Sequence, residues 1–289
     1  MNKVRSRRMI VPNMHLLEVD APEIASKIQP GQFVIVRAVG RGERIPLSVA
    51  DWDRGEGTLT IVFMEVGAST AALASLQPGG SLATCVGPLG KPTEIARFGT
   101  VLAVGGCYGI GSLFPAVRAL KEAGNKVVAA FEARSSYLLY WLDRYASLAD
   151  RVFTITRDGS NGIKGHVSHL NDVINTLERQ PDLALVNGCT YLLRRSAEIT
   201  KPFGIKTVVS LNPIMIDGTG MCGVCRVSVA GRTRFACVDG PEFDGHAVDW
   251  DELMARRKAY LEEETLFFRR TGPAPAPSET IHDGGRCQQ

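Results

Sequence analysis

The sequence predicts an antiparallel β barrel followed by a doubly wound α/β domain and a short cysteine-rich segment. Three observations carry this prediction. Short strands separated by turn signals fill residues 9–95, apolar strands alternate with helical stretches over 98–210, and three cysteines lie within residues 222–237. Evenly spaced short strands are typical of a small barrel, whereas strand and helix in alternation indicate a parallel sheet covered by helices.

The 289 residues are enough for two main hydrophobic cores. In the first part, the expected strands include QFVIVRA, LSVAD, TLTIVFMEV and SLATCVG; in the second they are VLAVGG, KVVAAFEA, RVFTITRD, LALVNG and TVVSLN. The C-terminal run TGPAPAPSETIHDGGRCQQ is rich in proline, glycine and polar residues, which is typical of disorder. We therefore expect a barrel at 1–97, an α/β domain at 98–210, a cysteine segment with a C-terminal helix at 211–270, and a disordered tail at 271–289.

Composition excludes two classes of partner. The formal net charge is +3, and no cluster of lysine and arginine is interleaved with aromatic residues, so nucleic acid is not expected. No apolar run approaches the roughly 18 residues that cross a membrane, and Pro12, Asn13 and His15 interrupt what a signal peptide would need. We expect a cytoplasmic protein whose thiols stay reduced, which favours metal ligation over disulfides for the clustered cysteines.

The cysteine spacing resembles that of an iron–sulfur loop with one thiolate missing. Two residues separate Cys222 from Cys225, and eleven separate Cys225 from Cys237. Plant-type 2Fe-2S loops use C-x4-C-x2-C and a more distant cysteine, and Asp217 stands where the first cysteine belongs. A carboxylate is anionic and binds iron, so we interpret D-x4-C-x2-C-x11-C as a cluster site. The same four ligands would also suit zinc, and free thiols in a turn are the third reading.

A glycine-rich turn follows the first strand of the α/β domain. The run VLAVGGCYGIGSLFPAVRAL places Gly105, Gly106, Gly109 and Gly111 between strand and helix, where glycine lets a dinucleotide approach the backbone. At the end of the next strand, Glu132 is expected to bond ribose hydroxyls, while the adjacent Arg134 would favour a phosphate. The acid indicates NAD rather than NADP.

The runs SLNPIMIDGTGMCGVCRV and FACVDGPEFDGHAVDWDEL closely resemble the small, FAD-containing subunit of the NADH-dependent reduced ferredoxin:NADP oxidoreductases, known in related forms as sulfide dehydrogenase beta subunits. That family is related to the electron-transfer subunit of dihydroorotate dehydrogenase and, more distantly, to ferredoxin-NADP reductases. The resemblance covers residues 9–265 and implies a ferredoxin-reductase-like fold. It also implies ligation by Asp217, Cys222, Cys225 and Cys237, because the dihydroorotate relatives use four cysteines instead.

The same resemblance implies flavin and nucleotide contacts. In ERIPLSVAD, Arg44 would pair with the FAD pyrophosphate, and Ser48 would hydrogen-bond the flavin N5 edge. Pro46 and Leu47 lie between them in the same motif. The alternative is that these are ordinary strand residues beside a proline kink. Gly67, Ser69 and Thr70 begin a helix whose amides favour a phosphate. The loop at Asp158 and the turn at Gly188 match nucleotide contacts in the family.

Two departures from the family concern the nicotinamide site. Cys107 replaces the third glycine of the turn and Gly111-Ser112 replaces Ala-Pro, and the segment 188–190, which contains Cys189, differs from the usual run. The resemblance implies a subunit that passes electrons between NAD(H) and a partner through FAD and a 2Fe-2S cluster. The implied partner is a larger flavin and 4Fe-4S subunit of the glutamate-synthase-small-subunit-like type. The alternatives are a dihydroorotate dehydrogenase electron-transfer subunit, a relay that has lost nicotinamide binding, and a zinc-binding regulatory module.

Overall fold

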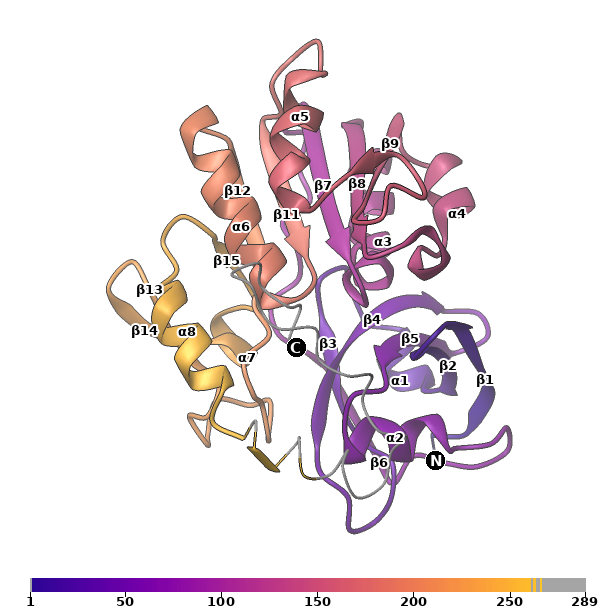
Figure 1. The fold of residues 1–289 in the computed structure, drawn as a ribbon. Coiled ribbons are helices and arrows are strands. Elements are labelled where there is room, and N and C mark those ends of the chain that lie inside the picture. The colour runs from indigo at the N-terminus through magenta and orange to yellow at the C-terminus, as the bar shows by residue number, and fades with distance from the viewer. Residues whose placement is uncertain (1, 261, 264–265, 267–289) are drawn as a thin grey trace.

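A computed structural model of the protein describes residues 2–260, 262–263 and 266. The tail expected at 271–289 lies outside the described residues. Figure 1 shows three parts: a barrel below, an α/β part above, and a segment running from β13 to α8 that lies beside both.

The N-terminal part is a six-stranded antiparallel sheet in the order β1-β2-β5-β4-β3-β6. Lys3 bridges to Ser81, which brings the start of the sheet to the segment before β6. Leu17, Leu59 and Phe63 fill the interior, and the short helices α1 (Pro22–Ala25) and α2 (Ala68–Ala74) flank it. The strands are β1 (Val4–Val11), β2 (Met14–Asp20), β3 (Phe33–Arg37), β4 (Ile45–Asp53), β5 (Thr58–Met64) and β6 (Thr84–Leu89).

The second sheet has seven strands in the order β10-β9-β8-β7-β11-β12-β15. The first six run parallel, as their continuous apolar sequences predict for strands buried on both faces. They are β7 (Thr100–Gly106), β8 (Lys126–Ala133), β9 (Arg151–Thr156), β10 (Ile163–Lys164), β11 (Leu183–Asn187) and β12 (Lys206–Ser210).

Helices cover both faces of this sheet. Helix α3 (Gly109–Glu122) packs between one face and the barrel, where Leu113 contacts the core shared by Phe131 and the barrel residue Val62. Helices α5 (Leu170–Asn175) and α6 (Thr190–Thr200) cover the other face (Figure 1). The short α4 (Leu142–Ala146) and the 3-10 turns η1 (Ser136–Leu138), η2 (Val167–His169) and η3 (Lys201–Phe203) complete the connections.

The cysteine segment is built into the large sheet. Strand β15 (Glu242–Asp244) pairs antiparallel with β12, through Ser210 and Glu242 among others. A three-residue strand carries too short a pattern to be predicted from periodicity. The hairpin β13 (Arg226–Val229) and β14 (Arg232–Phe235), the short α7 (Ala236–Asp239) and α8 (Trp250–Arg257) make up the rest.

A small core joins the cysteine segment to the barrel. Phe33 and Ile35 of β3 point out of the barrel and pack with Met215, Cys225 and Cys237. Because β3 also pairs with β4, the expected flavin strand is one strand away from the cysteines. This packing places the two expected redox sites next to each other.

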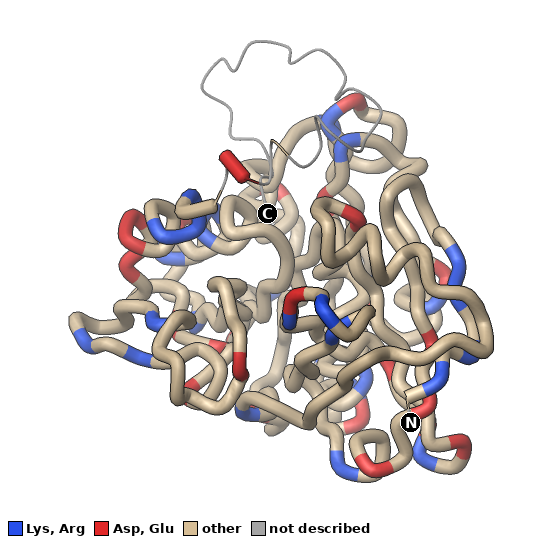
Figure 2. The backbone as a smooth tube through the Cα atoms, turned by 90° about the horizontal axis from the view of Figure 1, so that it is seen from below, with Lys and Arg blue, Asp and Glu red and all other residues tan. Residues whose placement is uncertain are grey.

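Within the described part of the chain, no helix combines the length and the apolar character that a membrane crossing requires. Figure 2 shows lysine and arginine interspersed with aspartate and glutamate along the backbone.

Candidate functional site

The loop between Asp217 and Cys237 contains three glycines whose backbone lies in the left-handed φ/ψ region. Gly218, Gly220 and Gly223 have φ of 77°, 86° and 67°, values that a residue with a Cβ adopts only at a cost. A Cβ on Gly218 would lie 2.7 Å from Leu89 Cδ1 and 2.9 Å from Ile35 Cγ1. Glycine therefore lets the loop lie directly on the barrel strands β3 and β6.

Two of the three loop cysteines already touch. The Sγ atoms of Cys225 and Cys237 are 3.2 Å apart and both residues are buried, whereas Cys222 is exposed. Burial raises the pKa of the Cys237 thiol to about 12, and the neighbouring Cys225 adds to this rise. Two buried thiolates this close would repel each other, so a bound cation is needed to ionise both.

Asp217 is held beside Cys222 by backbone hydrogen bonds. Its Oδ1 accepts from the amide of Thr219 and its Oδ2 from the amide of Cys222, both at 2.8 Å. These bonds, with that from Thr219 the largest cause, lower the pKa of the Asp217 carboxyl, so it is anionic at neutral pH. The Asp217 carboxylate also contributes to the raised pKa of the Cys237 thiol.

These residues fit an iron–sulfur cluster in chemistry and in placement on one loop. Three sulfur donors and one anionic oxygen lie between positions 217 and 237, around glycine amides suited to bond cluster sulfurs. Among the described residues, however, no three His, Cys, Asp or Glu side chains are already grouped as a metal site. Ligation therefore requires Cys222 and Asp217 to turn towards the buried pair. The assignment of Asp217 as a ligand stays a prediction.

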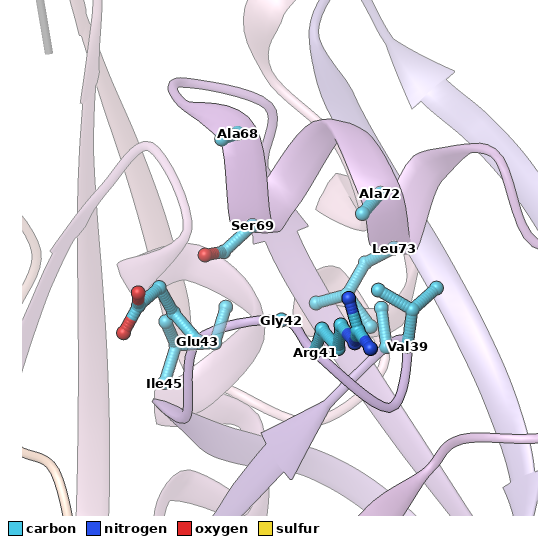
Figure 3. A pocket seen from close by; sticks show the side chains of 10 residues that line it. Val39, Arg41, Gly42, Glu43, Ile45, Ala68, Ser69, Ala72 and Leu73 are labelled. Atoms are coloured by element: carbon cyan, nitrogen blue, oxygen red, sulfur yellow. The ribbon is translucent and has the colours of Figure 1, made fainter.

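Of the expected flavin residues, only Ser69 lines a pocket on the barrel. This pocket, of about 310 Å³, is formed by the β3–β4 loop and α2, and Ser69, Glu43 and Arg41 line it (Figure 3). Arg44 is exposed next to this loop, whereas Pro46, Leu47 and Ser48 are half-buried in β4 and pair with Ile35, Val34 and Phe33.

Not every residue of the expected phosphate turn is free to face a ligand. Thr70 Oγ1 accepts hydrogen bonds from the amides of Val66 and Gly67, at 2.8 and 3.0 Å, so this hydroxyl holds the start of α2. Sequence reasoning missed Arg41 and Glu43. Arg41 stands two residues before the motif ERIPLSVAD, and Glu43 is its first residue, so their only signal was this position beside Arg44.

The two turns of the α/β part that are expected to bind the nucleotide are in direct contact. Gly105 and Gly106 end β7 and Gly109 begins α3; a Cβ on Gly109 would lie 2.0 Å from the carbonyl oxygen of Asn187 and 2.7 Å from Gly188 Cα. Gly188 has φ of 152° and follows β11. Only glycine at 109 lets these turns meet at the carboxyl edge of the sheet, where doubly wound folds bind ligands.

Replacing Gly109 by alanine is expected to destabilise the fold by about 3 kcal/mol or more, because the added methyl group would overlap backbone atoms that cannot rotate away. Urea unfolding monitored by circular dichroism measures this change. Gly40→Ala is the matched control, since no atom lies within 4 Å of its added Cβ. Equal stability of the two variants would contradict the close approach of the turns.

The sequence placed Gly111 in the glycine turn, but in the structure it lies inside α3. Its amide donates to Tyr140 Oη at 2.9 Å, and a Cβ would lie 3.0 Å from Val62 Cβ in the barrel. The glycine at 111 therefore serves packing between α3 and the barrel. Cys107 has φ of 52°, a left-handed conformation that favours glycine, and burial raises the pKa of its thiol to about 11.

Glu132 lies at the carboxyl end of β8 but is turned into the protein. It is 5% exposed, and its Oε1 is 3.5 Å from Arg157 Nε and 3.9 Å from His166 Nδ1. Burial raises the pKa of the Glu132 carboxyl, with Arg157 opposing the rise. The expected ribose contact therefore competes with these two internal partners, which lie in the loops after β9 and β10 and were not anticipated. Arg134 is exposed beside it.

Asp158, on the next loop, is also used locally. Its Oδ1 accepts from the amide of Ser160 at 3.0 Å and from the hydroxyl of Ser160 at 2.6 Å. These bonds shape the glycine-rich loop after β9, at the same carboxyl edge as Glu132.

Comparisons with known proteins agree with this arrangement. The family model of the iron–sulfur cluster binding domain of dihydroorotate dehydrogenase B matches residues 212–249. A Thermotoga maritima protein described as the electron transfer subunit homolog of dihydroorotate dehydrogenase B (NAD(+)) is 42% identical over 270 residues, covering 93% of this chain and 95% of that protein.

Solved structures extend the agreement to the fold. One is a structure of the NADH-dependent reduced ferredoxin-NADP oxidoreductase, reported for flavin-based electron bifurcation. It has a TM-score of 0.88 at 41% identity, over 93% of this chain and 97% of the other. A ferredoxin NADP+ reductase from Neisseria gonorrhoeae has a TM-score of 0.56 at 18% identity, over 70% and 90%, which supports the fold alone. The predicted ferredoxin-reductase-like fold and the predicted oxidoreductase subunit are confirmed. The chain belongs to the family of the electron-transfer subunits of dihydroorotate dehydrogenase B and their homologues.

Proposed function

We propose that this chain passes electrons between NAD(H) and a larger flavin and 4Fe-4S subunit, within an electron-bifurcating or related oxidoreductase. The observation that carries the proposal is the core shared by the barrel and the cysteine segment. Ile35 packs against Cys225 and Cys237 and pairs across to Pro46 of the flavin strand. When bound, FAD supplies hydride acceptance from NADH, and a 2Fe-2S cluster supplies one-electron transfer.

The residues of the chain provide binding and insulation for this chemistry. Arg44, Ser69 and the lining residue Arg41 offer donors for FAD phosphates at the barrel pocket. Gly106, Gly109 and Gly188 bring the backbone close to the nucleotide at the sheet edge. Cys222, Cys225, Cys237 and Asp217 would hold the cluster, with Ile35 and Leu89 covering the loop from the barrel side.

A second candidate, a relay that no longer binds nicotinamide, is favoured by one observation. Glu132 faces Arg157 and His166 inside the protein rather than an open ribose site. Anaerobic addition of NADH to the isolated chain separates the two functions. Loss of the yellow flavin absorbance is the expected result, whereas a flavin that responds to dithionite and not to NADH would establish the relay. Zinc in place of iron would contradict both.

The partner is expected to dock over the cysteine loop. Met221 is 88% exposed, and the apolar side chains of Ile216 and Val238 are exposed beside the ligand positions. An exposed apolar patch of this kind is typical of an interface, and methionine is enriched in interface cores. Ile35 of β3 and Leu89 of β6 contact the loop at Gly218, whereas Met221, Ile216 and Val238 are exposed and free to meet a partner.

Met221→Glu is expected to weaken association with the larger subunit at least tenfold, because a charge would be buried in the contact. Iron and flavin contents should stay unchanged, since Met221 is not a ligand. Co-expression with the larger subunit followed by calorimetry of the purified chains measures the effect. Met9→Glu is the matched control, because Met9 is also exposed but lies on β1, on the side of the barrel away from the cysteine segment (Figure 1). Equal loss of binding in both variants would contradict this docking face.

A further inference from the structure

A series of hydrogen bonds joins the two nucleotide turns to the start of the cysteine loop. Tyr108 Oη donates to the carbonyl oxygen of Gly188 at 2.8 Å. Asn212 Nδ2 donates to the Tyr108 hydroxyl and, at 3.1 Å, to the same Gly188 carbonyl. These residues follow β7, β11 and β12, three neighbouring parallel strands, so they meet at one edge of the sheet.

The hydrogen bonds continue from this edge into α8. Thr190 Oγ1 donates to Asn212 Oδ1 at 2.9 Å, and Arg257 Nη1 donates to Thr190 Oγ1 at 2.8 Å and to the Asn212 carbonyl at 3.1 Å. The preceding residue, Arg256, donates to the carbonyl of Val224 at 2.9 Å. Val224 stands between Cys222 and Cys225. Of these two consecutive arginines, Arg257 thus holds the turn after β11, and Arg256 holds the cysteine loop.

Each member of this series is fixed by more than one bond. The Tyr108 hydroxyl donates once and accepts once, and burial raises its pKa, so it remains a protonated donor. Asn212 uses its amide nitrogen, its amide oxygen and its backbone carbonyl. Such a satisfied polar network in a low-dielectric setting is rigid, so a shift at one end is transmitted to the other.

We propose that Tyr108, Asn212 and Arg257 are positioning residues that couple occupancy of the nicotinamide nucleotide site to the conformation of the cysteine loop. The inference rests on the proposed function, because it takes Gly188 and Thr190 as part of that site. A nucleotide that settles on this turn fixes the Gly188 carbonyl, and with it the Tyr108 and Asn212 side chains. Coupling of this kind is reciprocal, so the redox state of the loop's cluster alters nucleotide affinity by the same factor.

Tyr140 offers a matched control for Tyr108. Its hydroxyl donates to the carbonyl of Cys107 and accepts from the amide of Gly111, both at 2.9 Å. It therefore holds the same glycine turn, but from the side of α3. In the described part of the chain, neither hydrogen bond of its hydroxyl reaches the cysteine segment.

The experiment measures the midpoint potential of the cluster in the purified holoprotein, with and without saturating NAD+, by redox titration followed by electron paramagnetic resonance. In the native chain NAD+ is expected to shift this potential by about 40 mV, which corresponds to roughly fivefold coupling for a one-electron couple. Tyr108→Phe and Thr190→Val should lose the shift, whereas Tyr140→Phe should keep it. Two separate variants guard against a local folding defect in one of them.

Amide hydrogen exchange gives an independent readout. NAD+ should slow exchange over residues 217–225 in the native chain and in Tyr140→Phe, and leave it unchanged in Tyr108→Phe. A native chain that binds NAD+ in calorimetry without a shift in cluster potential would overturn the inference and leave the proposed function standing, as would a full shift in both Tyr108→Phe and Thr190→Val. A native chain that does not bind NAD+ would overturn the inference together with the nucleotide part of the proposed function.

Discussion

Replacing Cys237 by alanine is expected to abolish the cluster, with iron falling from about two atoms per chain to near zero. Cys237 is buried and its Sγ lies 3.2 Å from that of Cys225, so its loss removes one of the two thiols that already meet inside the expected site. FAD should remain bound, because the barrel pocket is formed by a different part of the chain. Iron and sulfide assays on anaerobically purified protein measure the loss, and NADH should still bleach the flavin.

Cys85→Ala is the matched control for that experiment. Cys85 is a half-buried thiol of β6 that packs with the barrel core, and burial raises its pKa to about 12. This variant should keep its iron. Full iron in Cys237→Ala, or equal loss in both variants, would contradict the assignment of the loop cysteines.

Replacing Asp217 by cysteine is expected to keep two irons per chain but to change the spectrum and shift the midpoint potential on the order of 100 mV. A soft thiolate replaces a hard oxygen at one of four positions, and exchanging two thiolates for histidine moves such clusters by several hundred millivolts. Visible absorption, electron paramagnetic resonance and redox titration measure the change. An unchanged potential would mean that Asp217 does not bind iron.

Asp217→Asn distinguishes a ligand from a residue that only shapes the loop. The amide oxygen can still accept from the Thr219 amide, which is the largest cause of the lowered Asp217 pKa, so the turn is retained. It lacks the anionic oxygen that iron prefers. We expect substantial iron loss in Asp217→Asn with little loss of stability. Full iron and a native spectrum in this variant would assign Asp217 to the turn alone.

The regular elements could be predicted because their signals are local. The apolar runs around Val101 and Val186 predict buried parallel strands, and the spacing of Cys222, Cys225 and Cys237 predicts one shared loop, since both depend on residues close in sequence. The family resemblance added the expectation that the strand at Ser48, whose neighbour across the sheet is Phe33, contacts the flavin.

The features that the sequence did not predict depend on contacts between residues that are distant in the sequence. Glu132 is followed by Arg157 and His166 only after 25 residues or more, so nothing local announces their contact. Strand β15 is too short to show a period. Tyr108 occupied a variable position of the glycine motif, and its partner Asn212 follows a different strand. Long-range contacts of this kind are set by the packing of the whole fold.

We expect an oxygen of Asp217 to complete the coordination of a two-iron centre otherwise held by sulfur. Iron-edge X-ray absorption of the anaerobically purified native chain, compared with Asp217→Cys, tests it most directly. We predict that both proteins show an iron neighbour to each iron. An oxygen ligand of iron should be seen in the native chain and should be absent from Asp217→Cys. Identical all-sulfur coordination in the two proteins, or a single metal without an iron neighbour, would contradict the account.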